Sequence, residues 1–563
     1  MRRIGVPPRR LVEPLFVALL ASVGAAWALG APAPGAIVGT LQTDKFGAMY
    51  LHHQAHRAFA EGGLPLIDRH QLFPIGAPLG ITNGANVLEM GVSWALRAVL
   101  DWPAWFNVAH VAWLPLNAVA FLVLARELWP EPRDAALRVA AALTWAFQPV
   151  FLGEIDAGRL TQVALVGLPL AVVGLDRASR RPLSRAELVY AASGLALTGL
   201  GYWYYAIFLA ICAPVWAAWA PRQVLPRFAA IGALALLLVS PALVGVAWSG
   251  WIYDVRPSLP GPPGGRSPLF DNALQLARAQ PPQLVGFWVW ALTPGLLLAV
   301  TQRAAWRWLA LGAVCVTFAL GPAQAIGGYG WRLPYYPLWL AVPTLDRLTH
   351  PSRWYDLGVI FVVVASFVGL RESRLLGGRA AWAAPLVALG LGAQLAARGP
   401  LPSEVPPRSS LWEAVARGSG ALVVLPLLHA PDAVRWQTLH GRPVIGGMVE
   451  GVPPFWPERF VAWVDRSPLL LGFVALASAG TPPAVRQGDV DALLEAGFTE
   501  VVLDAPSWRR FSRVPLERAL AGLTDGLGRP THQDADGALW ALPTAAPPGH
   551  AAPPPGITAR PPR

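Results

Sequence analysis

The chain has 563 residues, of which 54% are hydrophobic and 14% are charged, and this charged share is about half that of an average soluble domain. Several apolar stretches reach the ~20 residues that span a bilayer, so the composition excludes an ordinary soluble protein and predicts a polytopic membrane protein. The net charge of +11 does not indicate a nucleic-acid partner, because the arginines cluster in short loops between apolar runs. The two cysteines, Cys212 and Cys315, both lie in apolar runs, which supports neither a disulfide framework nor a zinc site.

The first apolar run covers residues 11–30 and follows "MRRIGVPPRR", whose arginines predict a cytoplasmic N-terminus. Small residues in "AWALGAPAPG" also permit a cleaved signal peptide, but the length of the run favours an uncleaved helix. Ten further spans are expected at 105–127, 138–153, 161–176, 188–202, 204–220, 228–249, 284–301, 307–326, 354–370 and 380–397. Residues 87–103 carry three charges, so this segment either lies in the interface or pairs with a neighbour as an extra crossing. The expected count is therefore eleven, with thirteen as the alternative.

Arginine-rich loops separate these spans. They read "ARELWPEPRDAALR", "DRASRRPLSR", "PRQVLPR", "TQRAAWR" and "RESRLLGGR". If all five are cytoplasmic, as the positive-inside rule predicts, the spans alternate consistently. The outer side then holds 31–86, 153–159, 250–283, 329–353 and the tail from about residue 398. One of the 44 basic residues is Lys and the other 43 are Arg, a bias that suggests a GC-rich bacterial genome. The prediction is therefore a bacterial inner-membrane protein with a periplasmic C-terminal domain.

From about residue 398 onward, short strand-like runs replace the long apolar runs of the preceding sequence. Three short runs read as buried strands, namely "GALVVLPLL" (420–428), "TEVVLDAP" (499–506) and "GALWALP" (537–543). "DVDALLEAGF" (489–498) reads as a helix with an Asp cap. The predicted fold is thus mainly α, with a transmembrane bundle over 1–397 that carries the outer loop 31–86. A small α/β domain is expected over 398–543, and the Pro-rich residues 544–563 are expected to be disordered.

The outer loop carries a concentration of titratable residues, "TDKFGAMYLHHQAH", at 43–56. Asp44 follows the first span by about fourteen residues, and an ionisable group near a membrane boundary is costly unless it is hydrated or paired. A carboxylate there suits a general base that deprotonates an acceptor hydroxyl. The alternative is that Thr43 or Asp44 simply caps the following helix. Helical spacing places three side-chain positions near one face: Tyr50, His53 and His56 or Arg57.

Two further outer stretches carry candidate residues. "GEIDAGRL" presents Glu154 and Asp156 as acids for an acceptor or a metal, and Arg159 for a phosphate; the alternative is a solvated turn with a local ion pair. "DRLTHPSRW" presents cations suited to a lipid-linked phosphate, which are Arg347, His350 and Arg353. The alternative there is an interfacial anchor. The aromatic "GYWYY" (201–205) is more typical of a membrane belt than of a sugar-stacking platform.

The order of these parts resembles the GT-C class of membrane glycosyltransferases, in which a first helix is followed by a long outer loop with an early acid. The matching pieces are "TDKFGAMYLHHQAHRAFAEGGLPLIDRHQLFPIGAPLG", "GEIDAGRL" in the place of a second acid, and "LTHPSRWYDL". The tail pieces "VVLPLL", "LHGRPVIGG" and "LLEAGFTEVVLD" are similar to tails of large bacterial relatives. One departure is that Thr43 and Lys45 flank Asp44, where many members have an Asp-Glu or Gly-Asp pair.

The resemblance implies a polyprenyl-phosphate-linked sugar as the donor, presented among membrane lipids at the outer leaflet. Asp44 would be the base, and four cations would stabilise the leaving lipid phosphate: Lys45, Arg159, Arg347 and Arg353. His53, His350, Glu154 and Asp156 complete the expected substrate-binding set. The acceptor, a glycan, lipid or protein, stays open. No cofactor or metal is expected, although Asp44, Glu154 and Asp156 could hold a metal if they converge.

Two rival interpretations remain open. The first is a non-catalytic polytopic protein that transports or helps assemble lipid-linked sugars or polysaccharide. The second is a degenerate relative of the enzymes that binds a lipid-linked sugar without turning it over.

Overall fold

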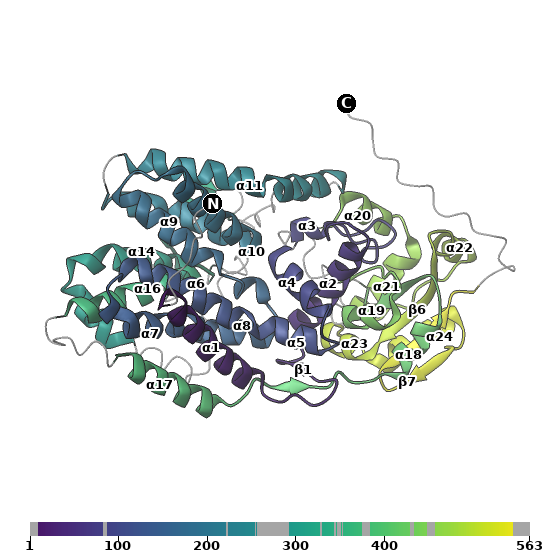
Figure 1. Cartoon of the computed structure of the whole chain (residues 1–563). Helices are drawn as coiled ribbons and strands as arrows, with labels where there is room; N and C mark the ends of the chain where they lie inside the picture. The colour runs from purple at the N-terminus through teal and green to yellow at the C-terminus, as the bar shows by residue number, and fades with distance from the viewer. Residues whose placement is uncertain are drawn as a thin grey trace. The chain divides into compact units, whose positions relative to one another are not determined.

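The computed structural model describes residues 9–82, 87–220, 223–253, 255, 292–326, 329–342, 345, 351, 353–373, 383–427, 433–447 and 456–543. It divides into two compact units (Figure 1). The helical unit comprises Met1–Thr40, Asn86–Pro241 and Ser258–Val405, and the α/β unit comprises Leu41–Ala85, Ala242–Pro257 and Pro406–Arg563. The outer loop therefore groups with the C-terminal domain from residue 41 onward, whereas the sequence boundaries assigned all of it to the bundle.

The helical unit is built mainly from apolar helices of very different lengths, from the six residues of α15 to the 33 of α10. They are α1 (Arg9–Leu29), α4 (Val87–Arg97), α5 (Ala104–Val111), α6 (Trp113–Leu128), α7 (Ala135–Ala146), α8 (Pro149–Ala157), α9 (Gly167–Arg180), α10 (Arg185–Ala217), α14 (Arg303–Ala319), α15 (Tyr336–Ala341), α16 (Arg353–Glu372) and α17 (Ala383–Arg398). Helix α11 (Val224–Ile252) contains the unit boundary at Pro241. Within the described ranges, seven helices are long and apolar enough to cross a membrane, or up to eight if a bent pair is one span. The prediction of a multi-span membrane protein is confirmed.

Helix α10 is interrupted at Tyr202, whose backbone is extended (φ −160°, ψ 107°). The arm before Tyr202 packs antiparallel to α9, because Gly174 lies against Ala191 and Gly167 against Thr198. The arm after it runs from Phe208, stacked on Trp354 at the start of α16, to Trp216, which meets Trp308 near the start of α14. The chain therefore reverses at Tyr202, and the two arms correspond to the predicted spans 188–202 and 204–220.

Helix α4 resolves the ambiguity over residues 87–103. It has eleven residues, which at 1.5 Å per residue extend about 16 Å. This length is well short of the ~30 Å hydrocarbon core. An extra crossing by α4, and with it a count of thirteen, is not supported. Glu89 on this helix is buried, and its burial raises the pKa of the carboxyl to about 8.

The arginine-rich loops meet at one end of the bundle, here called the arginine-rich end. Ion pairs connect these loops to one another and to α1. They are Glu13 with Arg126 and Arg138, Glu127 with Arg177, Asp176 with Arg180 and Arg307, and Asp134 with Arg371. Arg227 in the remaining loop donates to the carbonyl of Ala178 at 2.9 Å. The predicted common side of these five loops is confirmed, and the positive-inside rule predicts that this side is cytoplasmic.

The opposite end of the bundle gathers segments that were predicted to share the outer side. Helices α1 and α17 finish there together, since Trp27 Nε1 donates to the carbonyl of Leu395 at 3.1 Å. Just beyond them, the two-residue strands β1 (Ile37–Val38) and β4 (Ser403–Glu404) pair antiparallel. The ends of α8 and α10's first arm and the start of α16 belong to the same end. A two-stranded antiparallel hairpin, β2 (Ala323–Ile326) and β3 (Tyr329–Arg332), follows α14.

The α/β unit holds a four-stranded sheet of order β5-β6-β8-β7. Strands β5 (Ala421–Leu425) and β6 (Phe498–Asp504) are parallel, while β8 (Gly537–Ala541) is antiparallel to β6 and to β7 (His532–Asp534). Its helices are α2 (Thr43–Ala60), α3 (Leu79–Thr82), α18 (Ser410–Arg417), α19 (Val434–His440), α20 (Glu458–Asp465), α21 (Pro468–Ala479), α22 (Gln487–Glu495), α23 (Ala505–Phe511) and α24 (Leu516–Leu527). The three predicted strands and the predicted helix are confirmed. The expected Asp cap is wrong, because α22 begins at Gln487 with Arg486 at the N-cap, and Asp489 lies in its first turn. Residues 544–563 lie outside the described residues.

Helices cover both faces of this sheet. Leu422 and Val424 face a cluster with α18 and α19, whereas Val423, Leu425 and Val501 face a cluster with α20, α21, α22 and α24. The outer loop adds Leu72, Ala77 and Leu79 to this second cluster. The alternation of sides along β5 is what a strand buried on both faces requires.

Backbone hydrogen bonds tie the outer loop to the C-terminal domain inside the α/β unit. Leu72 N donates to the carbonyl of Gly446 at 2.9 Å, Phe73 N to that of Val444 at 3.1 Å, and Val444 N to that of His70 at 2.8 Å. Residues 444–446 therefore supply the backbone partners of residues 70–73.

The packing of α10 against α14 makes a testable prediction. The Sγ atoms of Cys212 and Cys315 are 3.8 Å apart, so a membrane-permeant oxidant such as diamide should join these two cysteines. We expect mass spectrometry of the digested protein to find a Cys212–Cys315 peptide pair that reduction separates. The variant Cys315→Ser is the control. Full alkylation of both thiols after oxidation would contradict the antiparallel packing of the second α10 arm.

Candidate functional site

Glu154 and Arg159 form an ion pair at the end of α8. The helix ends at Gly158, whose backbone is left-handed (φ 86°), a conformation that glycine adopts without strain. This turn brings Arg159 back onto the helix, where Nη2 donates to Glu154 Oε1 at 3.1 Å and Nε donates to Oε2. The local ion pair that the sequence left open is present. It is solvated on one side only, since the Arg159 side chain is 40% exposed and the Glu154 side chain 12%.

Gln162 connects this pair to α16. In the amide orientation that satisfies both ends, its nitrogen donates to Glu154 Oε2 at 3.2 Å and its oxygen accepts from Arg353 Nη2 at 3.2 Å. The guanidinium of Arg353 also lies 4.8 Å from the ring centroid of Tyr202, at the break in α10. Cation–π contact and the amide together hold the plane of this guanidinium.

Asp356 lies one turn after Arg353 and is buried. Its Oδ2 accepts a hydrogen bond of 2.7 Å from the hydroxyl of Tyr205, which comes from the second arm of α10. Asp356 also interacts electrostatically with Glu154, Arg353 and Arg159. These contacts define the charged cluster, whose members are Glu154, Arg159, Gln162, Tyr202, Tyr205, Arg353 and Asp356.

Asp156 is engaged elsewhere. Its Oδ1 accepts from Thr40 N at 2.9 Å and from Thr40 Oγ1 at 3.2 Å, and it attracts Arg398 at the end of α17. Asp156 thus contacts the segment after β1 and interacts with the end of α17, at the same end as the charged cluster. Across the described residues, no group of three acidic, histidine or cysteine side chains could share a metal ion.

The chemistry available to the charged cluster is recognition of an anion beside a fixed carboxylate. Two guanidinium groups, each a planar fork of donors, suit phosphate oxygens. Glu154 orients Arg159 directly through the ion pair and orients Arg353 through the amide of Gln162. The cluster sits at the opposite end of the bundle, where the sequence predicted the outer membrane face.

Asp44 and Lys45 lie in the first turn of α2 in the α/β unit, and their environments differ. Asp44 is exposed, and Gln42 occupies the N-cap, so neither Thr43 nor Asp44 is the cap. Lys45 is fully buried and acts on the neighbouring His52. The pKa of His52 is lowered to about 3, first by burial and then by His56 and Lys45.

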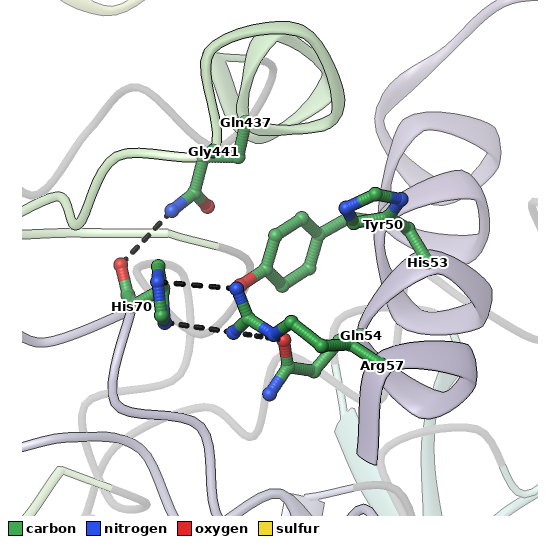
Figure 2. A pocket seen from close by; sticks show the side chains of 7 residues that line it. All are labelled: Tyr50, His53, Gln54, Arg57, His70, Gln437 and Gly441. Carbon is green, nitrogen blue, oxygen red and sulfur yellow. Dashed lines mark hydrogen bonds between the residues drawn. The ribbon is translucent and has the colours of Figure 1, made fainter. Parts of the chain in front are cut away.

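His53 is exposed on α2 and lines a small pocket with Tyr50 and Arg57 (Figure 2). The shared face predicted from their spacing is confirmed with Arg57 as its last member, because His56 is buried and does not line the pocket. Arg347 and His350 lie outside the described residues.

Four members of the charged cluster are absent from the predicted site set: Gln162, Tyr202, Tyr205 and Asp356. The two tyrosines belong to "GYWYY", which was interpreted as a membrane belt. Asp356 stands three residues after Arg353 inside an otherwise apolar span, and an acid in such a place is a functional candidate by default. That rule could have found it. Gln162 has no comparable pattern around it, since its role depends on contacts with segments far apart in the chain.

Comparisons with known proteins give structural similarity only. No family model and no curated protein matches the sequence. The chain is similar to the archaeal oligosaccharyltransferase AglB from Archaeoglobus fulgidus, solved with an inhibitory peptide and a dolichol-phosphate, at 12% identity and a TM-score of 0.49 over 91% of this chain and 72% of that one. It is also similar to ArnT from Cupriavidus metallidurans bound to undecaprenyl phosphate, at 13% identity and a TM-score of 0.40 over 96% and 99%. At these TM-scores, the likeness carries no conclusion about activity.

The hydrogen bond between Tyr205 and Asp356 yields a stability prediction. Tyr205→Phe leaves a buried carboxylate without this donor and should lower the free energy of unfolding by about 1–3 kcal/mol. Tyr190→Phe is the matched control on the same helix, since the Tyr190 hydroxyl has no hydrogen-bond partner and its removal should cost little. Unfolding of the purified protein in detergent would measure both variants. Equal costs would show that the Tyr205–Asp356 contact contributes nothing.

Proposed function

We propose that this protein is a membrane glycosyltransferase that moves a sugar from a polyprenyl-phosphate donor to an acceptor hydroxyl at the outer face of the bacterial inner membrane. The observation that carries the proposal is the charged cluster at the end of the bundle opposite the arginine-rich loops. A donor of this kind presents its phosphate where lipid meets water, which is the depth at which such an end lies.

Arg353 and Arg159 are assigned to the lipid phosphate. When the sugar leaves, charge develops on the phosphate oxygen, and fixed cations stabilise it most strongly in a water-poor site. Gln162 and Tyr202 hold Arg353, so little reorganisation is needed when the phosphate arrives. Glu154 pairs with Arg159 in the absence of a ligand and would help to release the product phosphate.

Asp44 is assigned as the general base. An exposed carboxylate in the first turn of a helix is reachable by an acceptor, and its oxygen can accept the proton of the attacking hydroxyl. The assignment draws on the resemblance of the outer loop to that of the GT-C class. Arg347 and His350 remain candidates for donor binding, and the acceptor remains a glycan, lipid or protein.

The base assignment is tested by Asp44→Asn, which preserves size and removes the charge. Mass spectrometry of glycolipids and surface polysaccharides in a strain lacking the gene first identifies the missing product. In membrane vesicles, Asp44→Asn should then lower the transfer rate roughly 10²- to 10⁴-fold. Asp525→Asn, at another exposed helical position, should transfer normally. Normal transfer by Asp44→Asn would rule out this residue as the base.

The phosphate assignment is tested by Arg353→Lys. This change keeps the positive charge but loses the planar fork and weakens the contact with Tyr202, so transfer should fall about 10-fold or more. Tyr202→Phe, which keeps the aromatic face, should stay within a few-fold of the wild type. If Arg353→Lys transferred sugar at the wild-type rate, the assignment of the charged cluster to the donor phosphate would be wrong. A deletion strain with unchanged glycoconjugates would favour a non-catalytic role instead.

A further inference from the structure

A second site for an anion lies entirely within the α/β unit. The pocket in Figure 2 has an empty volume of about 180 Å³, part of it open to solvent, and is lined by Tyr50, His53, Gln54, Arg57, His70, Gln437 and Gly441. Because the pocket opens to solvent, a compact group of a ligand can reach these side chains.

Arg57 has donors to spare in this pocket. A guanidinium carries five N–H donors. Arg57 Nη2 donates to Gln54 Oε1 at 2.6 Å, and Nη2 and Nη1 lie 2.8 and 3.1 Å from the two ring nitrogens of His70. Burial and then Arg57 lower the pKa of His70, so its ring is neutral at pH 7 and accepts only one hydrogen bond. At most two of the five donors are thus satisfied.

The half-buried cation of Arg57 also lacks an ion-pair partner. Within the described ranges, no carboxylate forms a salt bridge with Arg57. The nearest buried acid, Asp68, accepts from Tyr50 Oη, from His70 N at 2.8 Å and from Gln71 Nε2 at 2.9 Å. Glu61 is exposed and acts on His70 from a distance. A partly buried cation that keeps free donors is a site for an anion.

Gln437 supplies an acceptor as well. Its Nε2 donates to the carbonyls of His70 at 2.9 Å and Arg442 at 3.2 Å, which fixes the orientation of the amide. Gln437 is 2% exposed, and its Oε1 has no hydrogen-bond partner. In Figure 2 this oxygen faces the side of the pocket that holds Tyr50 and Arg57. A buried acceptor of this kind is costly unless a ligand or water donates to it.

We propose that this pocket binds a phosphate monoester, with Arg57 holding the anionic oxygens and Gln437 Oε1 accepting the proton of the P–OH group. A phosphate monoester has a second pKa of about 6, so it still carries that proton in part of the population near neutral pH. A carboxylate or a sulfate offers no proton to Gln437. The pocket is independent of the charged cluster, and the proposal holds whether or not the chain transfers a sugar.

The test measures saturable binding to the full-length protein in detergent at pH 6.5, by the shift of its melting temperature and by isothermal titration calorimetry. The probes are inorganic phosphate, glycerol 3-phosphate, short-chain phosphatidic acid in the micelle, and sulfate. We expect the phosphates to bind at least 10-fold more tightly than sulfate. Binding of the soluble probes identifies a soluble ligand, whereas binding of phosphatidic acid alone identifies a lipid headgroup.

Arg57→Gln should weaken phosphate binding at least 10-fold, and Arg57→Lys should weaken it less because the charge remains. Arg513→Gln, at an exposed position of the same unit, is the control and should bind as the wild type does. If Arg57→Gln does not fold, Arg57→Lys and the comparison with sulfate still test whether Arg57 binds the phosphate. No saturable binding, equal binding by the Arg57 variants, or equal affinity for sulfate would overturn the proposal.

Discussion

The helical unit is arranged by one constraint: charged side chains are costly inside a bilayer and must collect at the two ends of the spans. At the arginine-rich end, acids on one helix pair with arginines on another, as Glu13 does with Arg126 and Arg138 and Asp176 with Arg307. These pairs fix which helix ends lie together. The position of every other polar group then follows from the direction in which each span runs.

The same constraint explains why the charged cluster is informative. Arg159 and Arg353 come from segments almost two hundred residues apart in the sequence, yet Glu154 and Gln162 join them through short polar contacts. Asp356 and Tyr205 add a buried hydrogen bond one turn deeper. A bundle that needed only stability could have used apolar packing there, because buried ion pairs rarely stabilise more than well-packed apolar residues.

The sequence allowed the spans, the sharing of one end by the arginine-rich loops and the three main strands to be predicted, since each depends on a local pattern of apolar and charged residues. It also predicted the common face of Tyr50, His53 and Arg57, because helical spacing alone decides it. It did not reveal the burial of Lys45, the bridge by Gln162 or the pairing of Arg57 with His70. Those features depend on tertiary contacts, and no local periodicity encodes them. The role of Gln437 could not be predicted for the same reason, because its side chain bonds the carbonyl of His70, 367 residues earlier in the chain.

The backbone pairing of residues 70–73 with 444–446 has a consequence for engineering this molecule. A truncation that removes the C-terminal domain would also strip the segment carrying Asp44 of its hydrogen-bond partners and expose Leu72 to water. Replacing the C-terminal domain with that of another protein would likewise remove the hydrogen-bond partners of the outer loop. Residues 70–73 and 444–446 are far apart in the sequence but form one structural unit. A chimera should therefore take both segments from the same parent protein.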